Sequence, residues 1–227
     1  MAQEKTISRR SVLKIGGISA VAVGASGALA TNIAALCDAT PTQPLGPFYP
    51  ISDQADKNKD LTIVDGKTEM ASGTIIYLSG IVTDQNCDPV PNVAVEIWQA
   101  CATGRYNHPA DADNESPLDH NFQYWGIAIT NSEGAYDFKT IIPGHYWAGP
   151  GWIRPPHIHF KVHGKRIREL VTQMYFAGNQ YNDGDRILRE IPEDQRDSVV
   201  RTPLARQAED GRRAMDITFN INVFKLS

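Results

Sequence analysis

The sequence predicts an all-β protein, an antiparallel β-sandwich with long loops around its site and little helix. Several short segments alternate apolar and polar residues and are rich in β-branched and aromatic side chains, which is the pattern of half-buried strands. Clusters of Gly, Pro, Asn and Asp separate these segments and predict turns. The regular alternation of strands and helices that marks parallel folds does not occur, so we expect strands that pair with their neighbours along the chain.

The strand pattern recurs along most of the chain, in pairs separated by turn-forming residues. The segments are "IIYLSGIVTD" (75–84), "VAVEIWQA" (93–100), "YWGIAITNSEGAYDFKTII" (124–142, around the turn "NSEG"), "HIHFKVHG" (157–164) and "MDITFNINVF" (215–224). Successive side chains of a strand point to opposite faces. In the last segment this places Ile217, Phe219, Ile221 and Val223 on one face, which we expect to be the core.

Two segments lack the strand pattern. "DSVVRTPLARQAED" (197–210) is the one segment with helical character, and Pro203 interrupts it. "NHPADADNESPLDHN" (107–121) is polar and acidic, so we expect it to form a loop on the rim of a site. The chain has no internal repeat, and we expect one folded domain over residues 37–227.

The first 36 residues differ in composition from the rest. "SRRSVLK" (8–14) precedes an uncharged run rich in Gly, Ala and Ser, which ends in a small-residue cleavage motif, "ALA" (28–30). This is the shape of an export signal. The paired Arg9 and Arg10 resemble a twin-arginine signal, which predicts export to the periplasm or the cell exterior by the twin-arginine machinery. The alternative is that this run forms an amphipathic first helix of the fold. The run lacks the polar face that such a helix needs.

Charge and cysteine content limit partners and cross-links. The net charge of −4, with Lys and Arg scattered among acids, gives no basic surface for nucleic acid. Three cysteines permit one disulfide in an oxidising compartment. Cys87 and Cys101 are poorly placed to pair, because the intervening strand separates them by roughly 20 Å at about 3.3 Å per residue. We therefore expect Cys37 to pair with one of them and leave open which one.

The segment "RPPHIHF" (154–160) has the strongest chemical pattern in the chain. His157 and His159 lie two apart on a predicted strand, so their side chains project side by side, as metal ligands do. Two histidines on one face also occur as hydrogen-bonded rim residues, so the pair alone leaves both interpretations open. Tyr106 and Tyr146 each follow a predicted strand, where a lone tyrosine ordinarily packs half-buried.

The combination of segments resembles the intradiol ring-cleavage dioxygenases, nearest to the protocatechuate 3,4-dioxygenase branch. The matching segments extend from Pro44 to about Asp185. They are "PLGPFYP", "GIVTDQNCDPVPNVAVEIWQACATGRYNHP", "LDHNFQYWGIAITNSEGAYDFKTIIPGHYW", "IRPPHIHFKV" and "LVTQMYFAGN".

The resemblance implies a mononuclear, non-haem Fe(III) held by two tyrosinates and two histidines. The implied ligands are Tyr106, Tyr146, His157 and His159. Phenolate oxygen is a hard anionic donor, which suits ferric iron. The resemblance further implies that Tyr146 leaves the iron when substrate binds and helps to take up the substrate protons.

Two polar residues match the family's active-site arginine and glutamine. Arg154 lies three residues before the first histidine, and the rigid Pro155 and Pro156 tie it to the ligand strand. Its guanidinium is expected to stabilise negative charge that develops on the substrate ring. Gln173, in "TQMYF", is the second match.

The implied reaction opens the ring of a catechol-type substrate between its two hydroxylated carbons with O2, giving a cis,cis-muconate-type diacid. The branch resemblance favours protocatechuate. Enzymes of that branch commonly pair two unlike chains, whereas this single chain has both the "PLGPFYP" segment and the full ligand set, which leaves a homo-oligomer open. The main alternative is a non-catalytic, transthyretin-like β-sandwich binding module, because "GIVTDQNCDPVPNVAVEIW" also fits such modules. A copper or zinc protein that uses the histidine pair is a further alternative.

The remaining candidates carry weaker expectations. His108, His120 and His163 lie in loops or at a strand end, where we expect solvated rather than ligating side chains. His145 is next to a proposed ligand and is expected to support it from outside the metal's own ligand set. Trp147 is expected either to form a wall of the pocket or to pack in the core.

Overall fold

The computed structural model describes residues 37–226, so the predicted export signal lies outside the described residues. Strands dominate this part of the chain, and its helical content is a single short α-helix with two 3-10 turns. The all-β class with little helix is therefore confirmed. Between residues 37 and 226 we find no helix with the length and apolar character needed to cross a membrane.

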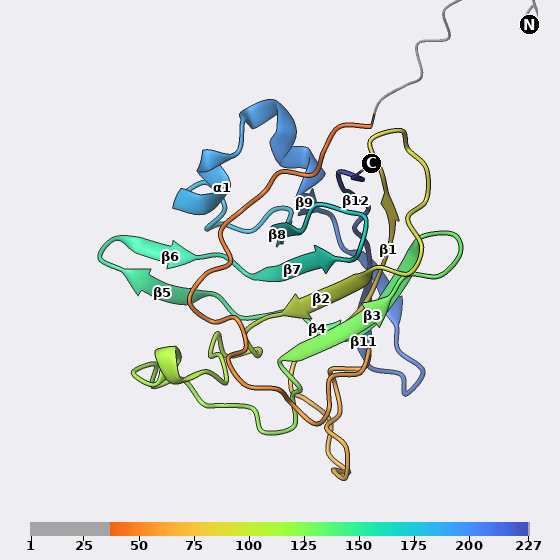
Figure 1. The fold of residues 1–227 in the computed structure, drawn as a ribbon. Helices are drawn as coiled ribbons and strands as arrows, with labels where there is room; N and C mark the ends of the chain where they lie inside the picture. The colour runs from red at the N-terminus through yellow and green to blue at the C-terminus, as the bar shows by residue number, and fades with distance from the viewer. Residues whose placement is uncertain (1–36, 227) are drawn as a thin grey trace, which may run out of the picture. The chain divides into compact units, whose positions relative to one another are not determined.

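The strands divide into two five-stranded sheets and a separate hairpin (Figure 1). The first sheet contains β1 (Ile75–Thr83), β4 (Ala135–Ile141), β10 (Leu204–Gln207), β11 (Arg213–Thr218) and β12 (Ile221–Asn222). The second has the order β3 (Trp125–Ile129), β2 (Ala94–Trp98), β7 (His157–His163), β8 (Leu170–Phe176) and β9 (Val200–Arg201). The hairpin pairs β5 (Tyr146–Gly149) with β6 (Trp152–Arg154).

The pairing is mixed, which corrects the predicted wholly antiparallel arrangement. Strand β1 runs parallel to β11 and β12, and β8 runs parallel to β9, whereas the other pairs are antiparallel. The three parallel pairs join segments with intervening structure between them, so no hairpin turn sets their relative direction. The alternation in a sequence identifies the buried face of a strand and does not identify its partner.

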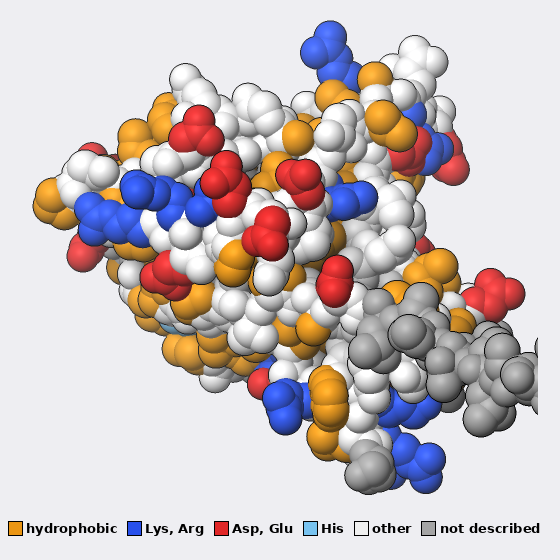
Figure 2. Space-filling model, turned by 90° about the horizontal axis from the view of Figure 1, so that it is seen from above, with side chains coloured by type: hydrophobic (Ala, Val, Ile, Leu, Met, Phe, Trp, Pro, Cys, Tyr) orange, Lys and Arg blue, Asp and Glu red, His pale blue; other side chains and the backbone are white. Residues whose placement is uncertain are grey.

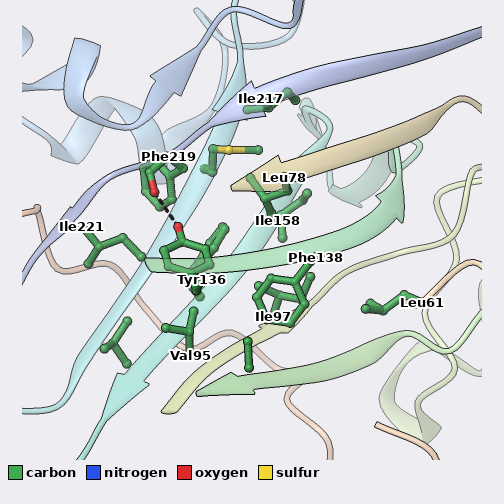
Figure 3. Close-up of a cluster of buried hydrophobic side chains, with 14 of the residues drawn as sticks. Leu61, Leu78, Val95, Ile97, Tyr136, Phe138, Ile158, Ile217, Phe219 and Ile221 are labelled. Carbon is green, nitrogen blue, oxygen red and sulfur yellow. Dashed lines mark hydrogen bonds between the residues drawn. The ribbon is translucent and has the colours of Figure 1, made fainter. Parts of the chain in front are cut away.

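The core lies between the inner faces of the two sheets (Figure 3). Side chains from β1 and β4 meet side chains from β2, β7 and β8, and β11 adds Ile217. The predicted core face of segment 215–224 is confirmed, because its four apolar side chains are at most 2% exposed. Tyr136 donates a hydrogen bond from its buried hydroxyl to the Phe219 carbonyl oxygen, so this polar group is satisfied within the core.

The helical prediction for residues 197–210 is wrong. A 3-10 turn ends at Ser198, and β9 and β10 follow on either side of Pro203. Proline lacks the N–H that a helix interior needs, and Val199 is fully buried. The α-helix instead spans Arg186–Glu190 (α1), and the 3-10 turns are η1 (Pro109–Asp111) and η2 (Glu193–Ser198).

Strand β8 is not among the predicted strands, because it lacks the alternation that reveals a half-buried strand. Six of its seven residues are buried. In a strand that is covered on both faces, each side chain is apolar or has its polar groups hydrogen-bonded within the protein. The outer face of this sheet must therefore be covered by other parts of the chain.

Residues 37–50, called the strap here, provide part of that cover. The strap begins at a disulfide between Cys37 and Cys87, which confirms Cys37 as a disulfide partner and leaves Cys101 as a buried free thiol. It crosses the outer face of the second sheet (orange in Figure 1), where the Gln43 N–H donates to the Val171 carbonyl at 2.9 Å. The end of the strap reaches the side chains described next.

Candidate metal centre

His157 and His159 point away from the core, toward the outer face of the second sheet. The residues that alternate with them, Ile158 and Phe160, are fully buried in the core. Both histidines are also only 2% exposed, and their Nε2 atoms lie 3.2 Å apart. The carbonyl oxygen of Pro155 accepts a hydrogen bond from His157 Nδ1 at 2.7 Å, which leaves the Nε2 lone pair free to bind a cation.

Two glycines bring the tyrosine-bearing segments together. Gly104 has φ +85°, and a Cβ there would lie 2.1 Å from the His145 carbonyl oxygen, so only glycine fits. Gly144 N–H donates to the Cys101 carbonyl at 2.9 Å. As a result, Tyr106 and Tyr146 lie beside each other, with ring centroids 5.7 Å apart.

The four predicted donors converge. Tyr106 Oη lies 3.4 Å from His157 Nε2, and Tyr146 contacts the same imidazole ring, with centroids 5.8 Å apart. Metal–nitrogen bonds of about 2.0–2.1 Å allow two ligands of one ion to lie up to about 4 Å apart, so the His157–Tyr106 and His157–His159 distances of 3.4 and 3.2 Å fit a single ion.

The donor set suits ferric iron better than softer metals. Within residues 37–226, His, Cys, Asp and Glu side chains form no group of three or more that could hold a metal. The oxygen donors nearest the two imidazoles are instead the phenol groups of Tyr106 and Tyr146. Hard anionic oxygen donors beside two imidazoles favour Fe(III), so the residues present fit the ion that the sequence implies.

Burial keeps all four donors uncharged when no cation is bound. It lowers the pKa of both His157 and His159 well below 6.5, and the nearby Arg154 charge lowers it further. Burial also raises the pKa of Tyr106, an effect increased by Tyr146, and it raises the pKa of Tyr146. A ferric ion must therefore displace the phenolic protons, so its binding should weaken as the pH falls.

The lowered histidine pKa values predict an acid-sensitive apoprotein. Below about pH 6.5 the unfolded chain takes up a proton on each histidine, whereas folded His157 and His159 stay neutral. The unfolding free energy of iron-free protein should fall between pH 6.5 and 5.5 by up to about 1.4 kcal/mol per pH unit for each of them. Urea unfolding across this window measures the slope, and His120→Ala, at an exposed position, should leave it unchanged. A flat profile would contradict the assignment.

Arg154 and Gln173 lie together beside the donors. Arg154 is 4% exposed, and its Nη2 donates to Gln173 Oε1 at 2.5 Å. Gln173 stands opposite His159 in the β7–β8 register. The predicted pair, Arg154 and Gln173, is thus adjacent to the two histidines. Arg154, which carries the charge, also lines the cavity beside them.

The sequence reasoning missed Asp185 and Tyr175, which hold Arg154 and its partner Gln173 in place. Asp185 is fully buried, and its Oδ1 lies 3.1 Å from Arg154 Nε and accepts from Trp152 Nε1 at 3.0 Å. Tyr175 donates to Gln173 Oε1 at 3.2 Å and accepts from Gln43 Nε2 at 2.9 Å. Tyr175 could have been found, because it lies two residues after Gln173 on one strand face. Asp185 lies in a polar loop with no periodic pattern.

Aromatic rings hold the donors from the sides. Trp98 stacks on His159 with centroids 4.7 Å apart, and Phe48 of the strap stacks on Tyr106 at 4.4 Å. Gly46 has φ +76°, and a Cβ at this position would lie 3.3 Å from His159 Cε1. The strap therefore packs directly over the second histidine.

The other histidines lie outside the donor cluster. His120 and His145 are exposed, and His145 packs against the Tyr181 ring at 4.7 Å. His108 accepts from the Ala110 N–H, and His163 is hydrogen-bonded to Glu96 Oε1 at 2.7 Å. His163 is thus half-buried and bonded rather than fully solvated.

A cavity of about 830 Å³ opens beside the donors. Its walls come from the strap, the loop 110–116, the segment 144–148 and strand β6 with its neighbours. The predicted rim position of loop 107–121 is therefore confirmed for residues 110–116. Trp147 lines this cavity and is 70% exposed, which excludes the core position.

The chain is similar in sequence to known dioxygenases. The chain is 39% identical over 178 residues to the protocatechuate 3,4-dioxygenase beta chain of Burkholderia cepacia, covering 77% of this chain and 75% of that one. It is 31% identical over 161 residues to the catechol 1,2-dioxygenase of Acinetobacter baylyi, which is 65% of this chain but only 50% of the relative.

The fold comparison and the family model complete the assignment. The 3-chlorocatechol 1,2-dioxygenase structure from Rhodococcus opacus shares the fold, with a TM-score of 0.65 at 21% identity over 82% of this chain and 73% of that one. A family model described as dioxygenase matches residues 45–224. The chain therefore belongs to the intradiol dioxygenase family.

Proposed function

We propose that this protein is an Fe(III)-dependent intradiol dioxygenase. It opens the ring of a catechol-type substrate between the two hydroxylated carbons with O2 and gives a cis,cis-muconate-type diacid. The observation that carries the proposal is the convergence of Tyr106, Tyr146 and two buried histidines beside the fixed Arg154. A transthyretin-like binding module has no need for this arrangement of donors.

Tyr106, Tyr146, His157 and His159 would hold the iron. Ferric ion at this position supplies a Lewis acid for both catechol oxygens and makes the ring reactive toward O2. Tyr146 is less buried than Tyr106 and stands at the cavity wall. It is therefore the phenolate that can leave the donor set and accept a substrate proton at Oη.

Arg154 contributes charge stabilisation. Arg154 is among the residues that line the cavity, and Asp185 and Gln173 hold its guanidinium in place. A cation fixed before the reaction stabilises negative charge on the bound ring without reorganisation. Phe48 stacks on the Tyr106 ring and covers one side of the donors.

The sequence resemblance favours protocatechuate within the catechol class, and the Burkholderia relative bears that substrate in its name. The two hydroxyls of any catechol would meet the same donors. The ring substituent must therefore be recognised by the rest of the cavity.

Colour and oxygen uptake test the proposed function. Iron-loaded protein should be burgundy to red from tyrosinate-to-Fe(III) charge transfer, and it should consume one O2 for each catechol converted to diacid. Tyr106→Phe should shift or bleach the band, whereas Tyr136→Phe, a buried tyrosine of the core, should leave it unchanged. A colourless protein with stoichiometric iron would rule out the tyrosinate ligands.

We also infer that the protein is exported, as the predicted signal in residues 1–36 implies. The Cys37–Cys87 disulfide supports this location, because such bonds persist in oxidising compartments. The face in Figure 2 mixes acidic and basic side chains, in keeping with the net charge of −4. We expect no nucleic-acid partner.

A further inference from the structure

In the described part of the chain, no Lys or Arg side chain that lines the cavity is left unpaired to bind an acidic substituent, and the imidazole that lines it, His145, packs against the Tyr181 ring. Arg154 is the one Lys or Arg among the residues described as lining it, and its guanidinium is already paired with Asp185 at 3.1 Å. Arg105 lies nearby and donates to the Ser116 carbonyl at 2.9 Å. Arg186 lies over the Trp152 ring, 5.1 Å from its centroid. Neither Arg105 nor Arg186 lines the cavity.

Three carboxylates line the same cavity. Asp113 and Glu115 are exposed on the rim loop, and across residues 37–226 neither forms an ion pair. Asp111 is buried and accepts hydrogen bonds from the Tyr106 N–H and from Asn114. A carboxylate on the substrate would meet repulsion here without a compensating ion pair.

An apolar surface faces this space. Trp147 and Ile153 of the β5–β6 hairpin line the cavity and are 70% and 37% exposed. The volume of about 830 Å³ lies within the range of about 300–1,000 Å³ in which proteins enclose drug-sized ligands. A single catechol ring at the donors therefore leaves room for a substituent that reaches Trp147.

We propose that the enzyme selects catechols whose ring substituent is uncharged or cationic and apolar enough to pack on Trp147, and that it discriminates against carboxylated catechols. The proposal rests on the proposed function, since it concerns the substituent of the same substrate. It reverses the preference for protocatechuate that the sequence resemblance favours. Asp113, Glu115 and Trp147 are the residues that set this specificity.

Protocatechuate and its methyl ester form a matched pair, because they differ in the charge of one substituent. Oxygen uptake by the iron-loaded, full-length protein should give a kcat/KM at least about fivefold higher for the ester at low ionic strength, as expected for two carboxylates near one anion. The ratio should shrink as salt is added, since the screening length falls to about 8 Å at 0.15 M. Asp113→Asn combined with Glu115→Gln should lower it by about threefold or more.

The benzyl ester of protocatechuate tests the aromatic wall. Its kcat/KM relative to the methyl ester should fall about fivefold in Trp147→Ala, the effect of losing one aromatic contact. Substitution of Trp147 with Phe should restore most of this ratio. An unchanged ratio in Trp147→Ala would overturn the role of the wall.

The outcomes separate this inference from the proposed function. Failure of the iron-loaded protein to cleave unsubstituted catechol would end the proposed function. If catechol is cleaved and protocatechuate is used as well as its ester, the charge selection is wrong and the function stands. An ester preference that responds neither to salt nor to the Asp113 and Glu115 substitutions would also overturn the charge argument.

Discussion

Replacing His157 with alanine is expected to remove bound iron and with it ring cleavage. The Nε2 of His157 is 3.2 Å from His159 Nε2 and 3.4 Å from Tyr106 Oη, so its loss breaks the cluster at its centre. Removing a group that merely supports a metal ligand costs about 10–100-fold in affinity or activity. Loss of the ligand itself should therefore exceed about 100-fold.

Metal analysis and visible absorbance after desalting measure the result. The matched control is His163→Ala, because His163 lies on the same strand and bonds Glu96 rather than the donors. That variant should keep both iron and colour. Retention of stoichiometric iron by His157→Ala, in protein with an unchanged near-ultraviolet circular dichroism spectrum, would refute the ligand assignment.

The histidine pair shows what strand periodicity can predict. The alternation of His157 and His159 with Ile158 and Phe160 places the two imidazoles on one face, and the structure confirms that position. The convergence of Tyr106 and Tyr146 on this pair could not follow from periodicity. It depends on contacts between distant loops, and the family resemblance alone indicated it.

Long-range pairing set the limits of the fold prediction. Strand β1 takes β11, a partner from near the end of the chain, in parallel, and local turn chemistry contains no signal for such a pair. Cys37 was predicted as one disulfide partner, but its choice between Cys87 and Cys101 stayed open for the same reason. Asp185 was missed because a buried ion pair between a loop and a strand leaves no local pattern in either segment.

Asp185→Ala is expected to destabilise the iron-free protein by about 3–5 kcal/mol, the cost of leaving a buried charge without its partner. Arg154 and Asp185 expose 5% and 0% of their side chains, so water cannot replace the lost carboxylate. Trp152 Nε1 would also lose its acceptor. Urea unfolding measures the change, and Asp183→Ala, an exposed substitution two residues earlier, is the control.

A double substitution separates the structural role of this pair from its chemical role. Arg154→Met with Asp185→Leu removes both buried charges, and such replacements are commonly neutral or stabilising. The double variant should regain most of the stability that Asp185→Ala loses and should bind iron with its colour intact. It should nevertheless cleave catechol at least about 100-fold more slowly, as removal of a fixed charge-stabilising group does. Full activity in this variant would show that the Arg154 guanidinium maintains the fold and takes no part in the reaction.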